Sequence, residues 1–347
     1  MPKALLKVKD YAVKLSPLIA FAVPLALIYL LNPLDTGLNL PMQETFQLMW
    51  KGRTFELFFI WLIALEFILG WETIKPQITK SKARLAAVAA VLALPTVYVL
   101  LESYFGLNGA IAGWSQQNGV AFANSMPLAV EYLVFSALFA LTTLLTFGKK
   151  GLSGFALPTL FAALVGVLYT IDNVFPYGTF TPFQLLVPTT AMLAAGVLGA
   201  MGYSVLSGTD AASGMPTLQV SGPLGSAQFA IAWPCAGIES LLIFTAVALL
   251  FLKRIPISWR AKIGFFAVGA AVTYFINVLR IATIFTIGMQ YGVDSQEVQM
   301  FHFYYGPLYA MAWIVSYPLI ILLSVGLWQK MKNRKALENS GNLNEHG

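Results

Sequence analysis

Residues 128–147 read LAVEYLVFSALFALTTLLTF, a run in which Glu131 is the single ionisable side chain. A helix that crosses a bilayer needs about 20 mostly apolar residues, so this run predicts a transmembrane helix. Further stretches of the same character surround it, at 15–31, 55–71, 85–101, 155–175, 183–203, 236–252, 263–288 and 308–328. The sequence therefore predicts an all-α polytopic membrane protein.

The composition excludes a soluble enzyme of ordinary surface. The chain has 347 residues, of which 10% are charged and 58% hydrophobic, whereas soluble domains carry about 25% charged residues. Its large apolar content equally excludes a disordered chain. The single cysteine, Cys235, excludes an intramolecular disulfide and a multi-cysteine cluster, and the two histidines leave little room for a histidine-built metal site. No metal and no cofactor are expected.

The basic residues predict the topology. Of the 21 lysines and arginines, 18 lie in five segments between the apolar stretches, at 3–14, 75–84, 149–150, 253–262 and 330–335. Positively charged loops face the cytoplasm, so both termini and these segments are predicted to be cytoplasmic. Because the positive charge follows topology and forms no concentrated stripe, nucleic acid is not an expected partner.

The number of crossings follows from these loops. The chain must cross an even number of times between 149–150 and 253–262, yet three candidate stretches lie there. The weakest is 183–203, which contains Pro188 and three glycines, so we expect a re-entrant or interfacial helix on the outer side. The prediction is about eight transmembrane helices.

A polar, Gly/Ser-rich segment, 204–234, separates that helix from the cysteine. Within it, 217–220 and 228–232 predict the strands of a small outer β-hairpin with a turn at 221–225. Such a hairpin could offer an edge strand to an extended peptide. The predicted organisation is then generic N-terminal membrane helices (1–154), a catalytic membrane domain containing this hairpin (155–335), and a polar cytoplasmic tail (336–347).

Arg280 is the cation that topology does not explain. It lies within the predicted span 263–288, about 8 residues or roughly 12 Å below the outer end. Ionisable groups inside a membrane are costly and mark functional sites by default. The alternative is a structural arginine paired with Glu66, Glu131 or Glu239.

Cys235 begins the span that precedes Arg280. Pro234 suits the first position of a helix, which would place Cys235 in the first turn, where free N–H groups and the helix dipole favour a thiolate. Gly237 would leave room beside the sulfur for a substrate backbone. The alternative is an inert cysteine buried as a small apolar residue.

Three further residues complete the candidate site. His302 lies in the outer connection before the last span. Asn277 stands one helical turn before Arg280, where it could orient the guanidinium or add an oxyanion donor. Glu239 follows Cys235 by four residues on the same helical face, where it could hold Arg280 or form a purely structural salt bridge.

The predicted topology places Cys235, Arg280 and His302 on the outer half of the membrane. Together they have the chemistry of thiol acyl transfer: a thiolate that attacks a peptide carbonyl, a fixed cation that stabilises the oxyanion, and an imidazole that takes and returns protons. We expect an active site on the outer face of the cell membrane.

The same residues resemble a known family. The run PCAGIES at 234–240, then NVLR at 277–280, then His302 is similar in order and spacing to the exosortase/archaeosortase family of membrane-embedded cysteine transpeptidases. The similarity covers roughly 180–328. Bacterial members often have Ser or Thr where Ala236 stands, and the run Gly-Ile-Glu-Ser at 237–240 is closer to archaeal members, so the sequence is archaeosortase-like.

The resemblance implies a reaction and partners. Members cleave the C-terminal sorting signals of secreted proteins, which consist of a short motif, a transmembrane helix and a basic cluster. They do so through a thioacyl intermediate and pass the new carboxyl to an acceptor, a membrane lipid in some archaeal members. By this resemblance Cys235 is the nucleophile, Arg280 the oxyanion or substrate-positioning cation, and His302 the general acid/base.

Two other functions compete with this interpretation. One is a secondary transporter with Glu66, Glu131 and Arg280 along its pathway, although the sequence shows no inverted repeat. The other is a non-catalytic assembly or scaffold component in which Cys235 is inert.

Overall fold

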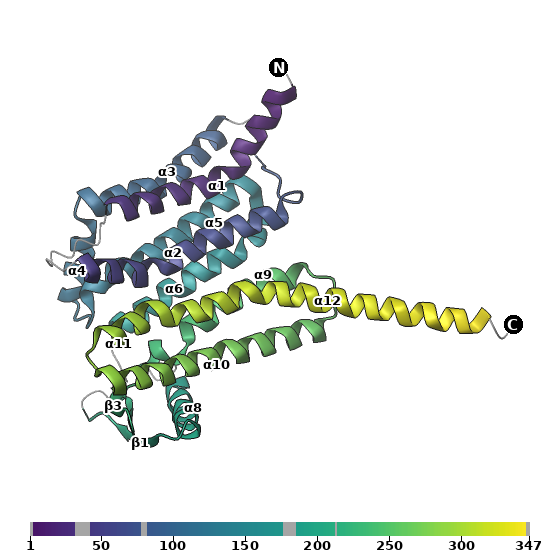
Figure 1. Ribbon diagram of the computed structural model, residues 1–347. Helices are drawn as coiled ribbons and strands as arrows, with labels where there is room; N and C mark the ends of the chain where they lie inside the picture. The colour runs from purple at the N-terminus through teal and green to yellow at the C-terminus, as the bar shows by residue number, and fades with distance from the viewer. Residues whose placement is uncertain (1–2, 32–41, 78–81, 176–184, 212–213, 345–347) are drawn as a thin grey trace. The chain divides into compact units, whose positions relative to one another are not determined.

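The computed structural model describes residues 3–31, 42–77, 82–175, 185–211 and 214–344. The described chain is mostly helical (Figure 1), and each of the nine predicted spans overlaps a helix. The helices are α1 (Lys3–Leu31), α2 (Met42–Gly70), α3 (Lys82–Tyr104), α4 (Leu107–Gln117), α5 (Met126–Gly154), α6 (Ala156–Val174), α8 (Leu186–Ala200), α9 (Ile238–Arg254), α10 (Trp259–Tyr291), α11 (Gln296–Met300) and α12 (Gly306–Asn344). Three short turns join them: η1 (Ala123–Ser125), η2 (Trp233–Ala236) and η3 (Phe301–Tyr305).

The helices confirm the predicted class, a polytopic helical membrane protein. In the described residues, six helical segments are long and apolar enough to cross a membrane: those of α1, α3, α5, α6, α10 and α12. The predicted count of about eight would add α2 and the 17-residue α9, and it stays a prediction. Helix α12 continues to Asn344, so most of the predicted tail is helical, whereas His346 lies outside the described residues.

Helix α8 corresponds to the stretch that the sequence marked as the weakest span. It has 15 residues, which is about 22 Å at 1.5 Å per residue, shorter than the roughly 30 Å hydrocarbon core of a bilayer. This length agrees with a re-entrant or interfacial helix, and its position in the membrane stays a prediction.

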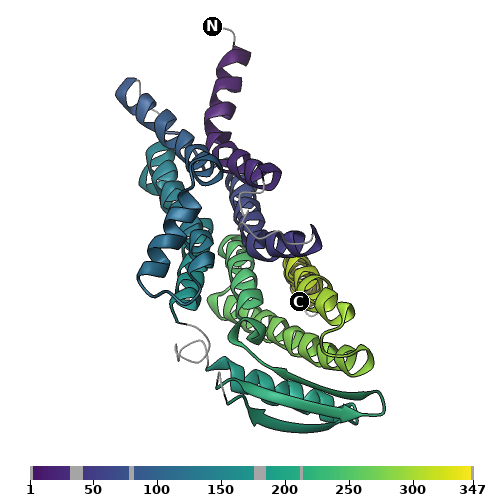
Figure 2. The ribbon, with the colours of Figure 1, turned by 90° about the vertical axis from the view of Figure 1, so that its left-hand side faces the viewer.

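A small sheet follows α8. Its strands are β1 (Ser204–Thr209), β2 (Pro216–Gly222) and β3 (Gly225–Ala230), in the order β1-β2-β3 (Figure 2). The hairpin predicted from the sequence is β2–β3, but its turn is shorter than the predicted 221–225. Gly225 has a φ of 126°, a backbone conformation that residues with a side chain rarely adopt and that permits such a tight turn. The prediction missed β1.

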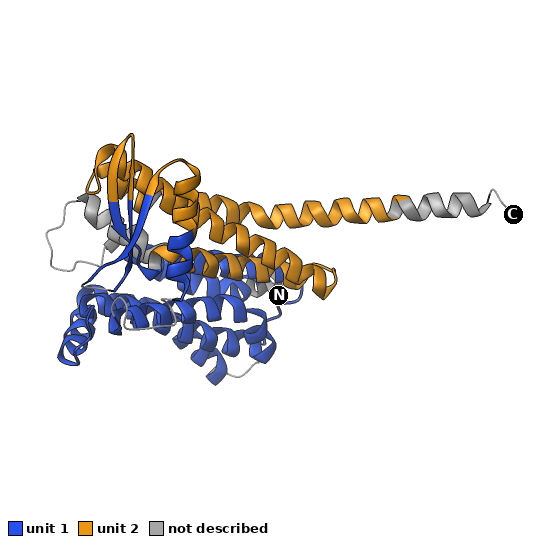
Figure 3. Cartoon of the chain, turned by 90° about the horizontal axis from the view of Figure 1, so that it is seen from below, with its two compact units in different colours: residues 1–192, 205–219, 228–233 blue, residues 193–204, 220–227, 234–347 orange. Residues whose placement is uncertain are grey.

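The chain divides into two compact units (Figure 3). Unit 1 consists of residues 1–192, 205–219 and 228–233, and unit 2 of residues 193–204, 220–227 and 234–347. The sheet and α8 have residues in both units. The predicted functional boundaries at 154/155 and 335/336 stay predictions.

A cluster of phenylalanines holds unit 1 together. Phe21 of α1 makes edge-to-face contacts with Phe59 of α2 and with Phe135 and Phe139 of α5, at centroid distances of 5.3–5.9 Å. All four rings are buried. Edge-to-face aromatic pairs add to the stabilisation that burial alone provides, so these contacts fix the three helices against one another.

The first three basic segments gather at one end of unit 1. Lys14 donates a hydrogen bond to the carbonyl of Trp71 and lies over its ring, 4.2 Å from the centroid. Arg84 donates to the carbonyl of Leu145 at 3.1 Å, one turn before Lys149. Segments that the sequence assigns to one membrane face therefore do lie together in this unit.

Helices α9, α10 and α12 form the core of unit 2. Gly269 of α10 has no side chain where the rings of Phe244 (α9) and Tyr317 (α12) come closest, and a Cβ there would collide with both. The Tyr317 hydroxyl donates to the carbonyl of Phe265 in α10 at 2.5 Å. This close packing places the start of α9, the second half of α10 and the start of α12 at the same end of the unit.

Candidate active site

Cys235 lies in a turn of its own. It belongs to the 3₁₀ turn η2, and Gly237 separates this turn from α9, which begins at Ile238. The prediction that Cys235 stands in the first turn of the following helix is therefore wrong. The physical reason is Gly237, whose φ of 85° is left-handed and interrupts the helix. Glu239, not Cys235, occupies the first turn of α9.

Asn277 of α10 holds the backbone of this turn. Its side chain is only 2% exposed, and its Nδ2 donates a 2.7 Å hydrogen bond to the carbonyl oxygen of Cys235. A Cβ on Gly237 would lie 3.0 Å from Cγ and Nδ2 of Asn277. Gly237 thus makes room for Asn277, whereas the sequence suggested room for a substrate. Asn277 thus contacts the cysteine turn, and its predicted role, to orient Arg280 or to add an oxyanion donor, stays a prediction.

His302 reaches the cysteine from a π-helical turn. The turn η3 joins α11 to α12, and it places His302 Nε2 3.6 Å from Cys235 Sγ. Both side chains are partly buried. The residues are 67 positions apart in the sequence, so the tertiary structure alone brings them together. π-Helical turns are rare and often occur at functional sites.

Arg280 of α10 is bonded to the same π turn. Its Nη2 donates a 2.7 Å hydrogen bond to the carbonyl oxygen of His302. Cys235 and Glu239 both attract its positive charge. The predicted role of Glu239, to hold Arg280, is thus electrostatically reasonable, although the predicted i, i+4 relation with Cys235 does not exist because the helix begins after Gly237.

The structure brings together all six residues that the sequence singled out. They come from the segment before α9, from the first turn of α9, from α10 and from the turn before α12, and all belong to unit 2. The basic loop 253–262 lies at the other end of α9, sixteen residues after Ile238, which is roughly 24 Å at the helical rise. The catalytic and supporting roles of the six residues stay predictions.

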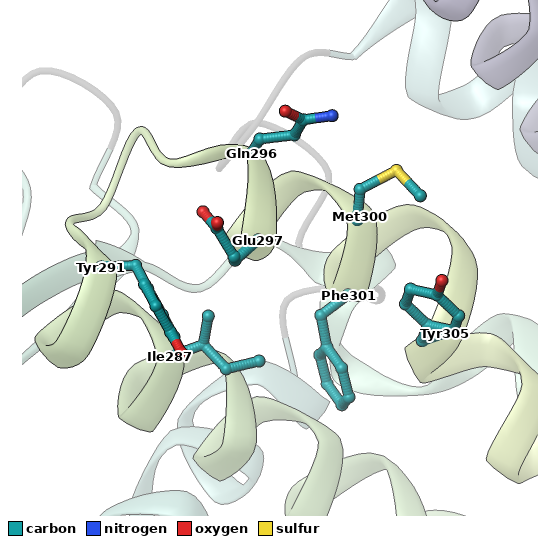
Figure 4. Close-up of a pocket in the computed structure, with 7 residues that line it drawn as sticks. All are labelled: Ile287, Tyr291, Gln296, Glu297, Met300, Phe301 and Tyr305. Carbon is teal, nitrogen blue, oxygen red and sulfur yellow. The ribbon is translucent and has the colours of Figure 1, made fainter.

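A pocket of about 440 Å³ adjoins the π turn. Phe301 and Tyr305, on either side of His302, form part of its wall (Figure 4). The rest of the lining comes from the end of α10 and from α11: Ile287, Tyr291, Gln296, Glu297 and Met300. The lining is mainly apolar and aromatic, with Glu297 as its one charged residue, and its volume falls in the range of ligand pockets.

Within the described residues, no group of three His, Cys, Asp or Glu side chains lies close enough to hold a metal ion.

Two features of the site, the π turn and Gly306, were not predicted from the sequence. Gly306 begins α12, and a Cβ there would lie 2.7 Å from Nε of Arg280. A glycine at the start of a long apolar helix was the only available signal, and such a glycine sometimes marks a close contact.

The sequence matches a known protein family. The family model described as "Transmembrane exosortase (Exosortase_EpsH)" matches residues 50–332, which is most of the chain and includes Cys235, Arg280 and His302. No curated protein and no solved structure matches the chain significantly.

Proposed function

The chain belongs to the transmembrane exosortase family, and on this premise we propose that it is a membrane-embedded cysteine transpeptidase with Cys235 as nucleophile. The observation that carries the proposal is the 3.6 Å distance between Cys235 Sγ and His302 Nε2. A nucleophile and a base within hydrogen-bond reach of each other are the signature of nucleophilic catalysis. The distance between them is often somewhat longer in the absence of substrate.

The residues supply each step of an acyl transfer. His302 accepts the thiol proton, and the Cys235 sulfur attacks the carbonyl carbon of the scissile peptide bond. The C–N bond breaks, His302 returns the proton to the leaving amine, and a thioester remains on Cys235. An acceptor nucleophile then gives its proton to His302 and displaces the sulfur, which regenerates the thiol.

Arg280 has two roles in this proposal. It donates one hydrogen bond to the carbonyl of His302 and so fixes the turn that carries the base. A guanidinium has five N–H donors, so others are available to stabilise the oxyanion of the tetrahedral intermediate. Glu239 attracts this charge and keeps Arg280 near the cysteine.

The pocket beside the π turn is our candidate for binding the recognition motif of the sorting signal. Ile287 and Tyr291 follow Arg280 by seven and eleven residues, on the same face of α10. Ile287 is thus roughly 10 Å beyond Arg280, a distance that about three residues of extended peptide span. The aromatic lining suits an apolar side chain at that place in the motif.

The substrates in this proposal are secreted proteins with a C-terminal motif, a transmembrane helix and a basic cluster, and a membrane lipid is a possible acceptor. Cleavage takes place at the outer membrane face. The roughly 24 Å between the cysteine end of α9 and its basic end supports this, because basic loops face the cytoplasm.

The transporter alternative receives less support. Glu66 and Glu131 are buried in unit 1, as intramembrane pathway residues would be. However, transport gives no reason for a cysteine and a histidine to be in contact, and the family is one of sorting-related transpeptidases.

The decisive experiment is mass spectrometry of the C-termini of secreted proteins from cells with the wild-type chain or Cys235→Ala. We expect the wild type to yield proteins that lack the C-terminal helix and carry the acceptor group, and Cys235→Ala to yield intact C-termini. A matched control is Ser324→Ala, because the Ser324 hydroxyl bonds only the carbonyl of Ile320 in its own helix. Normal processing by Cys235→Ala would overturn the proposal.

A further inference from the structure

Gly306 lies against the Arg280 side chain at the start of α12. It is buried at the first position of that helix. A Cβ built on it would lie 2.7 Å from Nε and 3.0 Å from Cδ of Arg280, and 2.8 Å from the carbonyl oxygen of Phe301. Contacts this short do not occur in real structures, so any side chain here would displace one of these groups.

The backbone of Gly306 does not itself require glycine. Its φ and ψ are −58° and −48°, ordinary helical values that every residue but proline adopts readily. Within a helix, alanine is preferred to glycine because it loses less conformational entropy. The missing side chain therefore has its reason in the close contacts with Arg280 and with the carbonyl oxygen of Phe301, and not in the φ and ψ of Gly306 itself.

The group displaced by such a side chain would be the Arg280 side chain. Phe301 O belongs to the backbone of the π turn, which is bonded into the start of α12, whereas the arginine side chain can rotate. Such a rotation would pull Nη2 away from the carbonyl of His302, the 2.7 Å bond that ties α10 to the π turn. Arg280 Nε is buried without a hydrogen-bond partner among the described residues, so no bond at Nε opposes this rotation.

We propose that Gly306 is a positioning residue for the Cys235–His302 pair. It allows Arg280 to lie directly on the π turn and hold the carbonyl of His302, which fixes the imidazole beside the sulfur. The inference rests on the proposed function for its catalytic meaning, but the contact can be tested without any substrate.

The test uses the fact that Cys235 is the only cysteine in the chain. The alkylation rate of the purified full-length protein by iodoacetamide, measured as a function of pH, reports on the thiolate and its neighbours. For Gly306→Ala we expect alkylation at neutral pH to slow about tenfold and the profile to move to more alkaline pH, because small misplacements of a catalytic group are costly.

The matched control is Gly326→Ala in the same helix, where a Cβ would meet nothing within 4 Å. Its alkylation profile should stay within about twofold of the wild type, as expected for an independent site. If Gly306→Ala also leaves the profile unchanged, Gly306 is not a positioning residue.

Measuring the effect of Gly306→Ala in an Arg280→Ala background distinguishes an effect that acts through Arg280 from a general disturbance of the fold. If Gly306 acts through Arg280, Gly306→Ala should change alkylation by no more than about twofold once Arg280 is absent. Equal effects in both backgrounds would overturn the proposal. If Gly306→Ala alone does not fold, the double variant should recover a monodisperse protein in detergent, since only the contact with the carbonyl oxygen of Phe301 is then left. Failure to recover would show that this backbone contact, and not Arg280, is the reason for the glycine, and would overturn the proposal.

The result of the alkylation test does not depend on whether the proposed function is correct. Normal processing by Cys235→Ala would reject the transpeptidase and leave the effect of Gly306 on alkylation intact. Conversely, an unchanged alkylation profile would reject Gly306 while processing still required Cys235.

Discussion

At the scale of single residues, Arg280 explains how the site tolerates a charge within a membrane helix. A cation at membrane depth is expensive unless it has polar or acidic partners. The structure gives Arg280 a polar partner, the carbonyl oxygen of His302 at 2.7 Å, and an acidic neighbour, Glu239. The same contacts that lower the cost of burial connect the cation to the proposed nucleophile and base.

Arg280→Lys should therefore abolish processing without unfolding the chain. Lysine keeps the positive charge but has a single ammonium group in place of the planar fork, so it cannot both hold His302 and stabilise an oxyanion. We expect processing of secreted proteins to fall by at least about 100-fold, the usual effect of losing an oxyanion donor. The measurement is the fraction of secreted protein that retains its C-terminal helix.

The control for this exchange is Arg260→Lys, at the exposed start of α10. Processing should be normal there, because an exposed cation contributes only charge. Normal processing by Arg280→Lys would show that charge alone suffices and would contradict the assigned geometry.

At the scale of elements, the site depends on two interruptions of regular helix. The left-handed Gly237 separates the cysteine turn from α9, and the π turn η3 interrupts the chain between α11 and α12. Each interruption turns a backbone carbonyl toward α10, where Asn277 and Arg280 donate to the carbonyls of Cys235 and His302. Helix α10 thus holds both segments of the proposed active site by their backbones.

Gly237→Ala tests the first interruption. Alanine at a φ of 85° is strained and its Cβ would press on Asn277, so we expect a loss of about 1–3 kcal/mol in the free energy of unfolding and a lower apparent melting temperature. Gly264→Ala in α10, where a Cβ would meet nothing within 4 Å, should be neutral or stabilise by up to about 1 kcal/mol. Equal melting temperatures for the two variants would refute this account of Gly237.

At the scale of the whole molecule, the described basic segments lie together in unit 1 and, in unit 2, lie apart from the candidate active site. In unit 1 the first three basic segments meet at one end, through the contacts of Lys14 with Trp71 and of Arg84 with Leu145. In unit 2 the loop 253–262 is separated from the cysteine by the length of α9. Both arrangements are those expected if basic ends face the cytoplasm and the reactive site faces outward.

Labelling with a membrane-impermeant maleimide tests this topology. In intact cells the reagent should label Cys235, because this single cysteine is predicted at the outer face. In a Cys235→Ala background, a cysteine introduced by Arg260→Cys should be labelled only after the membrane is permeabilised. The reverse pattern would place the proposed active site in the cytoplasm and would contradict the assigned substrates.

Much of this architecture could be predicted from the sequence because it depends on local composition. A run of about 20 apolar residues forms a membrane helix whatever its neighbours are, and all nine runs correspond to helices. The motifs around Cys235, Arg280 and His302 likewise indicated the family, since residue identity and order are properties of the sequence. The β2–β3 hairpin followed from strand and turn residues.

The arrangement within the site was decided by the tertiary structure. That Asn277 bonds the cysteine turn, that Gly237 makes room for Asn277, and that Gly306 makes room for Arg280 are contacts between residues 26 to 42 positions apart. Such contacts depend on how α9, α10 and α12 pack, which no local pattern encodes. The sequence by itself determined which residues could react, and only the packing of three helices decided that a sulfur and an imidazole 67 positions apart stand 3.6 Å from each other.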